Sequence, residues 1–326
     1  MRIVITGGCG FLGRRLAIRL LQEGSALGAI DDLVLFDHAA PALPLPEDRR
    51  LAVVTGDIAD RAAVARVIAP GTDAVYHLAA VVSAEAETDT DLGYRVNIDG
   101  TRAVLDACRA LGSRPRVVFT SSLAVYGGDL PPAAGDLTPL TPQNSYGVTK
   151  AIGELLVTDY SRKGFIDGRA LRLPTVVVRP GRPNRAATTF ASSIIREPLC
   201  GQDVVCPVSP DMVMAVASPR AVVNGLVHAL GIPGEAFGWS RALQLPGFSV
   251  SVGEMAEAVR RAGGAAAFGR IKWQPDPLVA AIVGGVPRVL KAPRAEALGF
   301  TCDSGIDEVV QNFIEDDLPL QRQLAG

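Results

Sequence analysis

The first twenty residues place the strongest constraint on how this chain can fold. A short apolar run at residues 3–5 meets glycines at positions 7, 10 and 13, and apolar residues then recur at helical spacing up to residue 21. Continuous apolar runs are typical of buried strands, and apolar residues at every third or fourth position are typical of amphipathic helices. The glycines between them allow a tight turn and a close approach to the backbone. The start of the chain therefore predicts a strand, a glycine loop and a helix.

The same alternation continues through the first half of the chain. Further apolar runs lie at residues 33–36, 51–54, 74–76 and 117–119, with helical stretches at 60–68 and 97–111. Strands that are apolar throughout are typical of parallel sheets covered by helices on both faces. The pattern predicts an α/β fold with a doubly wound parallel sheet of the Rossmann type. We expect this domain over residues 1–180, with a kinked strand at 169–178.

Beyond residue 180 the pattern is looser, because prolines and glycines become frequent. We expect helices at 219–230, 252–262 and 304–316, with some strands between them. A chain of 326 residues suits one large α/β unit or two unequal parts. Residues 181–326 are therefore expected to form mainly a smaller substrate-binding lobe, from which the chain can return to the sheet.

Composition excludes several classes of function. The formal net charge is −2, which gives no electrostatic case for binding nucleic acid or an anionic membrane. No apolar run approaches the ~20 residues of a membrane span, and the start of the chain does not resemble a signal peptide. The five cysteines are scattered, with no CxxC pair, which predicts reduced thiols and no zinc site. We expect a cytoplasmic protein without a metal that acts on a small molecule.

The glycine loop predicts a dinucleotide site. In doubly wound sheets, ligands bind beyond the carboxyl ends of the strands, and a pyrophosphate can rest on the N-terminus of the first helix. Asp37 ends the next strand, at about the spacing of an acid that binds the adenosine ribose. Its charge would repel a 2′-phosphate and so favours NAD over NADP. An ordinary strand–helix turn and a solvated strand-end acid are the alternatives. The residues expected to surround the pyrophosphate are Gly7, Gly10, Phe11, Leu12 and Gly13.

Residues at the next strand ends complete the predicted cofactor site. Asp57 could bind the adenine amino group, with Ile58 packing on the ring. The small residues after the fourth run, Leu78, Ala79 and Ala80, would let the cofactor pass over the strand end. We interpret the preceding His77 as a structural strand histidine with its hydrogen bonds satisfied.

Tyr146 and Lys150 form the predicted catalytic pair. They are four residues apart, so they project from one face of a helix. Oxidation of an alcohol needs a base for the hydroxyl proton, and a phenol with a pKa of ~10 is a weak base near neutrality. Lowering that pKa by ~3 units takes ~4 kcal/mol. One positive charge at ~4 Å supplies about this much at an effective dielectric of ~20. Lys150 and the nicotinium ring of bound NAD⁺ are two such charges. Without the other motifs, the four-residue spacing of Tyr146 and Lys150 would fit equally a pair of side chains on the surface of a helix.

Three polar residues are expected near this pair. Ser122 would hold the substrate oxygen, leaving hydride transfer to the nicotinamide, and Thr120 closes the same strand on the cofactor side. Lys150 would also hydrogen-bond the nicotinamide ribose. Asn97 lies at a helix start and could cap a helix or order a proton-relay water.

These motifs resemble the extended short-chain dehydrogenase/reductase family over at least residues 1–180. TGGCGFLG is similar to the TGxxGxxG loop, HLAA to the element after the fourth strand, and VFTSSLAVYG with SYGVTK to the segments of the catalytic serine, tyrosine and lysine. The resemblance implies NAD-dependent chemistry at an alcohol or carbonyl. It also implies a homodimer built through a four-helix bundle of residues 97–111 and 146–162.

Within that family the chain resembles the D-erythronate dehydrogenases most, in residues 77–87, 170–181 and 198–201. This resemblance implies NAD-dependent oxidation at C2 of a four-carbon sugar acid. Pro174 and Thr175 replace an asparagine-containing loop common in nucleotide-sugar epimerases, which disfavours a nucleotide-sugar substrate. Thr175 and Val176 then become candidates for the nicotinamide carboxamide, together with Pro174.

Three functions stay open at this point. A dehydrogenase of a small aldonate needs a cation for the carboxylate, and an arginine can bind one bidentately. The candidate substrate residues are Ser83, Arg179, Arg182 and Arg185, beside Ser122 and Tyr146. A nucleotide-sugar epimerase or dehydratase would use the same tyrosine and lysine, keep NAD bound and need a larger pocket. A non-catalytic cofactor-binding protein is disfavoured by the complete serine, tyrosine and lysine set.

Overall fold

The computed structural model describes residues 1–181 and 188–325. It contains two compact units, each built from separated segments of the chain. Unit 1 comprises residues 1–125, 144–172 and 223–243. Unit 2 comprises residues 126–143, 173–222 and the chain from 244 onward. The assignment of substrate binding to the second part of the chain stays a prediction.

A seven-stranded sheet forms the centre of unit 1, in the order β11-β7-β5-β4-β1-β2-β3. β1 pairs in parallel with β2 and β4, and the parallel ladder continues to β3 on one side and β5 on the other. The doubly wound α/β fold is therefore confirmed. The strands are β1 (Arg2–Thr6), β2 (Asp32–Asp37), β3 (Leu51–Thr55), β4 (Thr72–His77), β5 (Arg116–Ser122), β7 (Asp167–Leu173) and β11 (Ala242–Gln244).

The strand order reverses between β1 and β4. From β1 the chain builds β2 and β3 on one side, and β4, β5 and β7 follow on the other. The loops after β1 and β4 therefore separate at the sheet edge, which is where doubly wound sheets bind ligands. The glycine loop follows β1 and so lies at this switch point.

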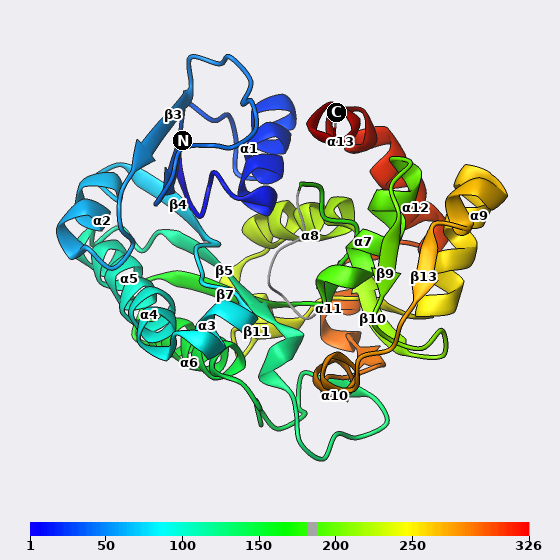
Figure 1. Cartoon of the computed structure of the whole chain (residues 1–326). Coiled ribbons are helices and arrows are strands. Elements are labelled where there is room, and N and C mark those ends of the chain that lie inside the picture. Colours follow the sequence, from blue (N-terminus) through cyan, green and yellow to red (C-terminus); the bar gives the residue numbers. More distant parts are fainter. Residues whose placement is uncertain (182–187, 326) are drawn as a thin grey trace. The chain divides into compact units, whose positions relative to one another are not determined.

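Helices cover both faces of the sheet (Figure 1). α2 (Arg61–Val67), α5 (Gly100–Ala110) and α6 (Ser145–Arg162) pack their apolar residues on one face, against Val4, Phe36, Val75 and Val117. α1 (Phe11–Glu23) lies on the other face, where Arg19 donates to Asn224 of α8 (Pro219–Gly231). Shorter helical segments are α3 (Ser83–Thr88), α4 (Thr90–Tyr94), the π-helix η1 (Arg95–Asp99), and the 3₁₀ turns η2 (Leu123–Val125) and η3 (Gly234–Phe237).

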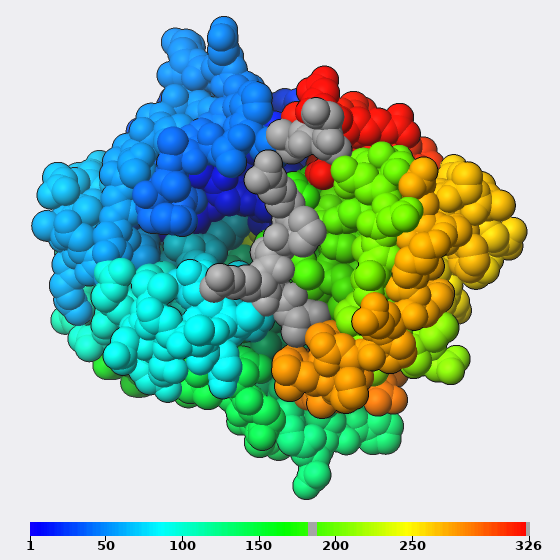
Figure 2. Space-filling model, in the orientation of Figure 1, coloured from blue at the N-terminus to red at the C-terminus, as the bar shows by residue number. Residues whose placement is uncertain are grey.

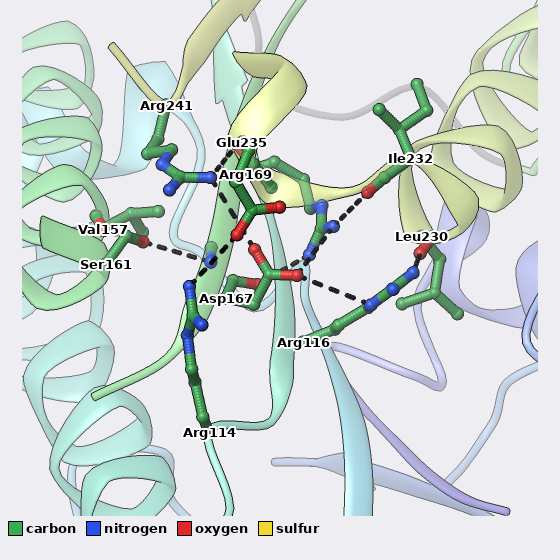
Figure 3. Close-up of polar contacts among 12 residues, drawn as sticks. Arg114, Arg116, Val157, Ser161, Asp167, Arg169, Leu230, Ile232, Glu235 and Arg241 are labelled. Atoms are coloured by element: carbon green, nitrogen blue, oxygen red, sulfur yellow. Dashed lines mark hydrogen bonds and ion pairs between the residues drawn. The ribbon is translucent and has the colours of Figure 1, made fainter. Parts of the chain in front are cut away.

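An arginine cluster joins residues 223–243 to the sheet at the amino ends of β5 and β7 (Figure 3). Asp167 forms ion pairs with Arg116, Arg169 and Arg241 at 3.5, 3.3 and 3.7 Å. The fully buried Arg169 also donates to the carbonyl of Ile232 at 2.5 Å. The cluster lies at the opposite end of the strands from the glycine loop and carries no predicted site residue.

Unit 2 has three small sheets, ordered β12-β10-β8, β13-β9 and β14-β6. α7, α9 and α12 contribute to one apolar core with β9, β10 and β12. The helices expected at 219–230, 252–262 and 304–316 are present, and the second extends to Phe268. The elements are α7 (Thr189–Leu199), α9 (Val252–Phe268), α10 (Pro277–Gly284), α11 (Pro293–Ala297), α12 (Ile306–Asp316), α13 (Leu318–Ala325), β6 (Ala134–Gly135), β8 (Thr175–Val176), β9 (Val204–Cys206), β10 (Val213–Ala217), β12 (Phe248–Ser251), β13 (Ile271–Trp273) and β14 (Leu290–Lys291).

Within the described part of the chain, none of the helices is both long and apolar enough to cross a membrane. Over the same residues, His, Cys, Asp and Glu side chains do not gather in groups of three or more that could hold a metal ion.

Candidate active site

The glycine loop is shaped by contacts that leave no room for side chains. Gly7 has a φ of 68°, and its N–H donates to the carbonyl of Phe36 at 2.8 Å. A Cβ at Gly7 would lie 2.7 Å from the backbone nitrogen of Ala79, beyond the end of β4. A Cβ at Gly13 would clash with the carbonyl of Gly7. Only glycine therefore lets β1, the first turn of α1 and the end of β4 meet in this way.

The N-terminus of α1 fits an anionic group. Gly10 is the N-cap, with no side chain capping the helix and no acidic residue in its first turn. The first-turn N–H groups of a helix point away from its carbonyls and carry partial positive charge. The space-filling view shows the dark-blue start of the chain in a hollow between lighter blue and cyan parts of unit 1 (Figure 2). These features fit a pyrophosphate held by Gly10, Phe11, Leu12 and Gly13.

Asp37 is held beside this loop. One carboxylate oxygen accepts from the backbone N–H of Cys9 at 3.0 Å, and the other accepts from that of His38 at 2.8 Å. The side chain is 10% exposed. The acid predicted to bind the ribose therefore borders the loop predicted to hold the pyrophosphate, and the contact with Cys9 fixes its direction.

The structure gives Asp57 and Ile58 partners within the protein. Asp57 forms an ion pair with Arg95 and accepts from the N–H of Ala59 at 2.9 Å. The backbone hydrogen bond, followed by the Arg95 guanidinium, lowers the pKa of Asp57. Ile58 is buried in the core of unit 1. Their contacts with adenine stay predictions.

His77 is buried and hydrogen-bonded on both ring nitrogens, as expected for a structural histidine. Nδ1 lies 2.6 Å from the hydroxyl of Thr6, and Nε2 lies 2.9 Å from that of Thr101. Burial, and then the charge of Lys150, lower the pKa of His77 to about 3. Leu78, Ala79 and Ala80 follow it, and Ser83 opens α3.

Tyr146 and Lys150 both lie on α6, one turn apart. Asn144 caps this helix, because its side chain accepts from the N–H of Gly147 at 2.8 Å. The Nζ of Lys150 is 5.6 Å from the centre of the Tyr146 ring and 4.8 Å from that of Phe119. Lys150 therefore lies close enough to influence the charge of the phenol.

Lys150 also joins α6 to the end of β5. Its Nζ donates to the carbonyl of Thr120 at 2.8 Å, and the residue is 3% exposed. Burial lowers the pKa of Lys150 to about 7, and the charge of Glu154 opposes that shift. Thr120 in turn donates from its hydroxyl to the carbonyl of His77 at 3.3 Å. Ser122 ends β5 two residues later, where its Oγ accepts from the N–H of Ala124 at 3.1 Å.

Asn97 lies in the π-helix η1 and does not cap a helix. Its Oδ1 accepts from the N–H of Val81 at 2.8 Å, and its Nδ2 donates to the carbonyl of Val81 at 3.0 Å. Nδ2 also lies 3.1 Å from the hydroxyl of Thr149, the neighbour of Lys150. π-Helical turns occur often at functional sites. Asn97 thus joins the segment after β4 to α6 beside the predicted catalytic pair.

Sequence reasoning missed a buried charged group beneath this pair. Glu154 is 2% exposed and Arg172 is 4% exposed, and they form a two-pronged ion pair with each other. The hydroxyl of Ser121 donates to the same carboxylate at 2.5 Å. Two signals were present: Glu154 lies four residues after Lys150, and Arg172 lies between Leu171 and Leu173 in the predicted strand.

The remaining candidates belong to unit 2. Thr175 and Val176 form β8, which pairs in parallel with β10, and Pro174 precedes it. The backbone of Arg179 is held on both sides, by the hydroxyl of Ser192 at its N–H and by the guanidinium of Arg196 at its carbonyl. Arg182 and Arg185 lie outside the described residues.

Comparison with known proteins identifies the family of this chain. Residues 3–229 match the NAD dependent epimerase/dehydratase family. The chain is 53% identical over 321 residues to D-erythronate dehydrogenase of Cupriavidus necator, covering 97% of this chain and 98% of the relative. It is 45% identical over 318 residues to D-erythronate dehydrogenase of Haemophilus influenzae, covering 98% and 100%.

A solved structure is similar over almost the whole chain. It is described as the nucleoside-diphosphate-sugar epimerase from Agrobacterium tumefaciens, with a TM-score of 0.93 and 42% sequence identity. The match covers 98% of this chain and 95% of the other.

Proposed function

The chain belongs to the NAD dependent epimerase/dehydratase family, and from this premise we propose that it oxidises the C2 hydroxyl of D-erythronate to the 2-oxo acid. Two relatives of this name, at 53% and 45% identity over nearly their whole length, support the substrate. NAD, when bound, supplies the hydride acceptor. The N-terminus of α1, which no side chain caps, and the fixed carboxylate of Asp37 are the features that fit it.

In this proposal the protein contributes a base, a cation and an orienting hydroxyl. Tyr146 takes the proton from the substrate hydroxyl, and Lys150 lowers the cost of the phenolate by its charge. Ser122 donates a hydrogen bond to the same substrate oxygen. The proposal is supported by the contact of Lys150 with Thr120, because Thr120 belongs to the strand that carries Ser122. Such orientation is the main contribution of the protein.

We further propose that the substrate carboxylate is bound by an arginine that follows β8, with Ser83 contributing a hydroxyl. Arg179 is the candidate whose backbone is fixed, by Ser192 and Arg196. Arg182 and Arg185 are the alternatives.

The observation that carries the proposal is the buried Lys150 held between Thr120 and the ring of Tyr146. The first prediction is that Tyr146→Phe lowers NADH formation from D-erythronate by at least about a hundredfold, the usual range for a general base. NAD affinity, measured by calorimetry, should change little because the phenol is not needed for binding. Unchanged turnover would reject Tyr146 as the base.

A second candidate is a nucleotide-sugar epimerase with tightly bound NAD, favoured by the name of the similar Agrobacterium structure. Such an enzyme regenerates its NAD in each turnover. Purified protein whose ~260 nm absorbance stays above the protein background after dialysis, with no net NADH release from D-erythronate, would favour the epimerase. Net NADH release from D-erythronate, with threonate as the epimeric control, would favour the dehydrogenase.

We also propose a cytoplasmic homodimer. The dimer rests on the family resemblance, with the helices at 97–111 and 146–162 as the interface. On α6, Leu155 is 65% exposed, and Tyr94 of α4 is 42% exposed, which supplies apolar surface next to these helices. The cysteines are free thiols, which supports a reducing compartment.

A further inference from the structure

A charged group lies below the predicted catalytic pair and is fully enclosed by unit 1. Glu154 follows Lys150 by one turn on α6, so the two side chains share a face of the helix. Both are buried, at 2% and 3% exposure. An unpaired buried carboxylate costs several kcal/mol, so its partners need an explanation.

Those partners come from two different strands. Arg172 of β7 donates from Nε to one carboxylate oxygen at 2.9 Å and from Nη2 to the other at 2.7 Å. Ser121 of β5 donates to the first oxygen at 2.5 Å. This fork geometry is the strongest arrangement for a guanidinium and a carboxylate.

The end of β5 binds the two buried charged side chains of α6, Lys150 and Glu154. Lys150 donates to the carbonyl of Thr120, while Glu154 accepts from the hydroxyl of the next residue, Ser121. No direct ion pair joins Lys150 to Glu154 among the described contacts. Glu154 therefore acts on Lys150 through its charge across one helical turn, in surroundings where water does not screen it.

The charges that face Lys150 can be named. Tyr146 and Glu154 lie on α6, His77 is on β4, and Arg172 reaches it through Glu154 from β7. His77 is neutral at ordinary pH because its pKa is about 3, and the guanidinium of Arg172 is paired with the carboxylate of Glu154. Glu154 is thus the one anion in this set when Tyr146 is protonated.

We propose that Glu154 is a positioning residue that keeps Lys150 an ammonium ion inside the protein, with Arg172 and Ser121 holding the carboxylate in place. Burial alone would drive Lys150 towards the neutral amine, which could no longer favour a phenolate on Tyr146. The proposal rests on the proposed role of Lys150 and extends it to an anion that does not touch the substrate. The buried charges next to Tyr146 are then positive at Lys150, negative at Glu154 and positive at Arg172.

Direct titration of Lys150 tests the proposal without substrate or cofactor. The lysines are Lys150, Lys163, Lys272 and Lys291, so ε-¹³C-lysine labelling gives a simple spectrum, with Lys150→Met as the assignment variant. In Glu154→Gln the titration midpoint of Lys150 should fall by about one pH unit or more, the size expected for loss of a nearby opposite charge. In Glu154→Asp, which retains the charge, it should stay within a few tenths of a unit.

Two further variants separate charge from structure. Ser121→Ala removes a hydrogen bond to the carboxylate but keeps its charge, so the midpoint should not move. Asp167→Asn disturbs the other buried charge cluster of unit 1, and it should lower stability while the Lys150 midpoint stays in place. If Glu154→Gln does not fold, the double variant with Arg172→Gln removes the pair together, and the midpoint should move in the same direction by a smaller amount.

The pH dependence of kcat/KM should shift in the same direction as the titration midpoint of Lys150. The alkaline limb of kcat/KM against pH should move to lower pH in Glu154→Gln and return in Glu154→Asp. An unchanged Lys150 midpoint in both the single and the double variant would overturn the proposal. That result is distinguishable from a wrong substrate assignment, because the titration is made on the protein alone, whereas a wrong substrate would abolish NADH release in the unmodified enzyme.

Discussion

Two basic side chains, His77 and Lys150, are buried near the ends of β4 and β5, where water does not reach them. Burial lowers the pKa of both groups, to about 3 and about 7. Between the lowered pKa of the folded protein and the ordinary pKa of the unfolded chain, each side chain is protonated in the unfolded chain and neutral in the folded protein. Folding stability therefore depends on pH at these two residues.

The lowered pKa of His77 predicts that the folded protein loses stability as the pH falls. Its folded pKa of about 3 lies below the ~6.5 of an exposed imidazole, so its contribution is present above pH ~6.5 and is lost as the pH falls towards 3. Between pH ~6.5 and ~5 this loss amounts to about 2 kcal/mol. The free energy of urea unfolding should fall by about this much more in the wild type than in His77→Gln over that interval. His38→Gln, at an exposed histidine, should retain the wild-type dependence, and an identical slope in His77→Gln would contradict the assignment.

At the scale of single elements, α6 carries several residues on which the proposed site depends. Its first turns carry Tyr146 and Lys150, its middle carries Glu154, and its start depends on the cap by Asn144. A helix that begins loosely would let the phenol move relative to the fixed strand β5. We therefore expect the cap to affect the proposed catalytic role of Tyr146 as well as stability.

We therefore predict that Asn144→Ala lowers the free energy of unfolding by about 1 kcal/mol, the usual cost of losing a cap. Because the first turn carries Tyr146, kcat should also fall severalfold, and amide hydrogen exchange should rise at the start of α6. Ser251→Ala is the matched control, since Ser251 caps α9 in unit 2 through the N–H of Glu254. It should lower stability by a similar amount with kcat unchanged, and equal activity of both variants would refute the coupling.

At the scale of the whole molecule, the chain crosses between its two units repeatedly. It leaves unit 1 after Val125, returns at Asn144, leaves after Arg172 and returns at Val223. The last return is fixed to the sheet by the arginines around Asp167, at the opposite end of the strands from the predicted catalytic pair. Unit 1 is thus completed by residues 223–243, which follow all of the candidate substrate residues in sequence.

The proposed dimer gives the prediction at this scale. Leu155→Glu places a charge on the most exposed apolar side chain of α6 and should convert the dimer to a monomer in size-exclusion chromatography with light scattering. Burying a charge at an interface costs several kcal/mol, which is enough to dissociate a dimer of ordinary affinity. Leu278→Glu, at a similarly exposed leucine of α10, should leave the mass unchanged. A dimeric Leu155→Glu variant would place the interface elsewhere.

The sequence by itself determined the features that depend on neighbours along the chain. Apolar runs, helical periodicity and glycine spacing are local, so they predicted the sheet of unit 1, the loop after β1 and the pairing of Tyr146 with Lys150 on one helix. It also predicted a structural His77, although not its partners Thr6 and Thr101.

Only the tertiary structure decided which distant residues meet. The contacts of Glu154 with Arg172 and Ser121 join residues 18 and 33 positions apart, and those of Asn97 with Thr149 span 52. Such contacts depend on the order and register of the strands and on the face of the sheet that each helix covers. No periodicity along the chain encodes them, because they arise when packing brings buried polar groups to the partners that offset their loss of water.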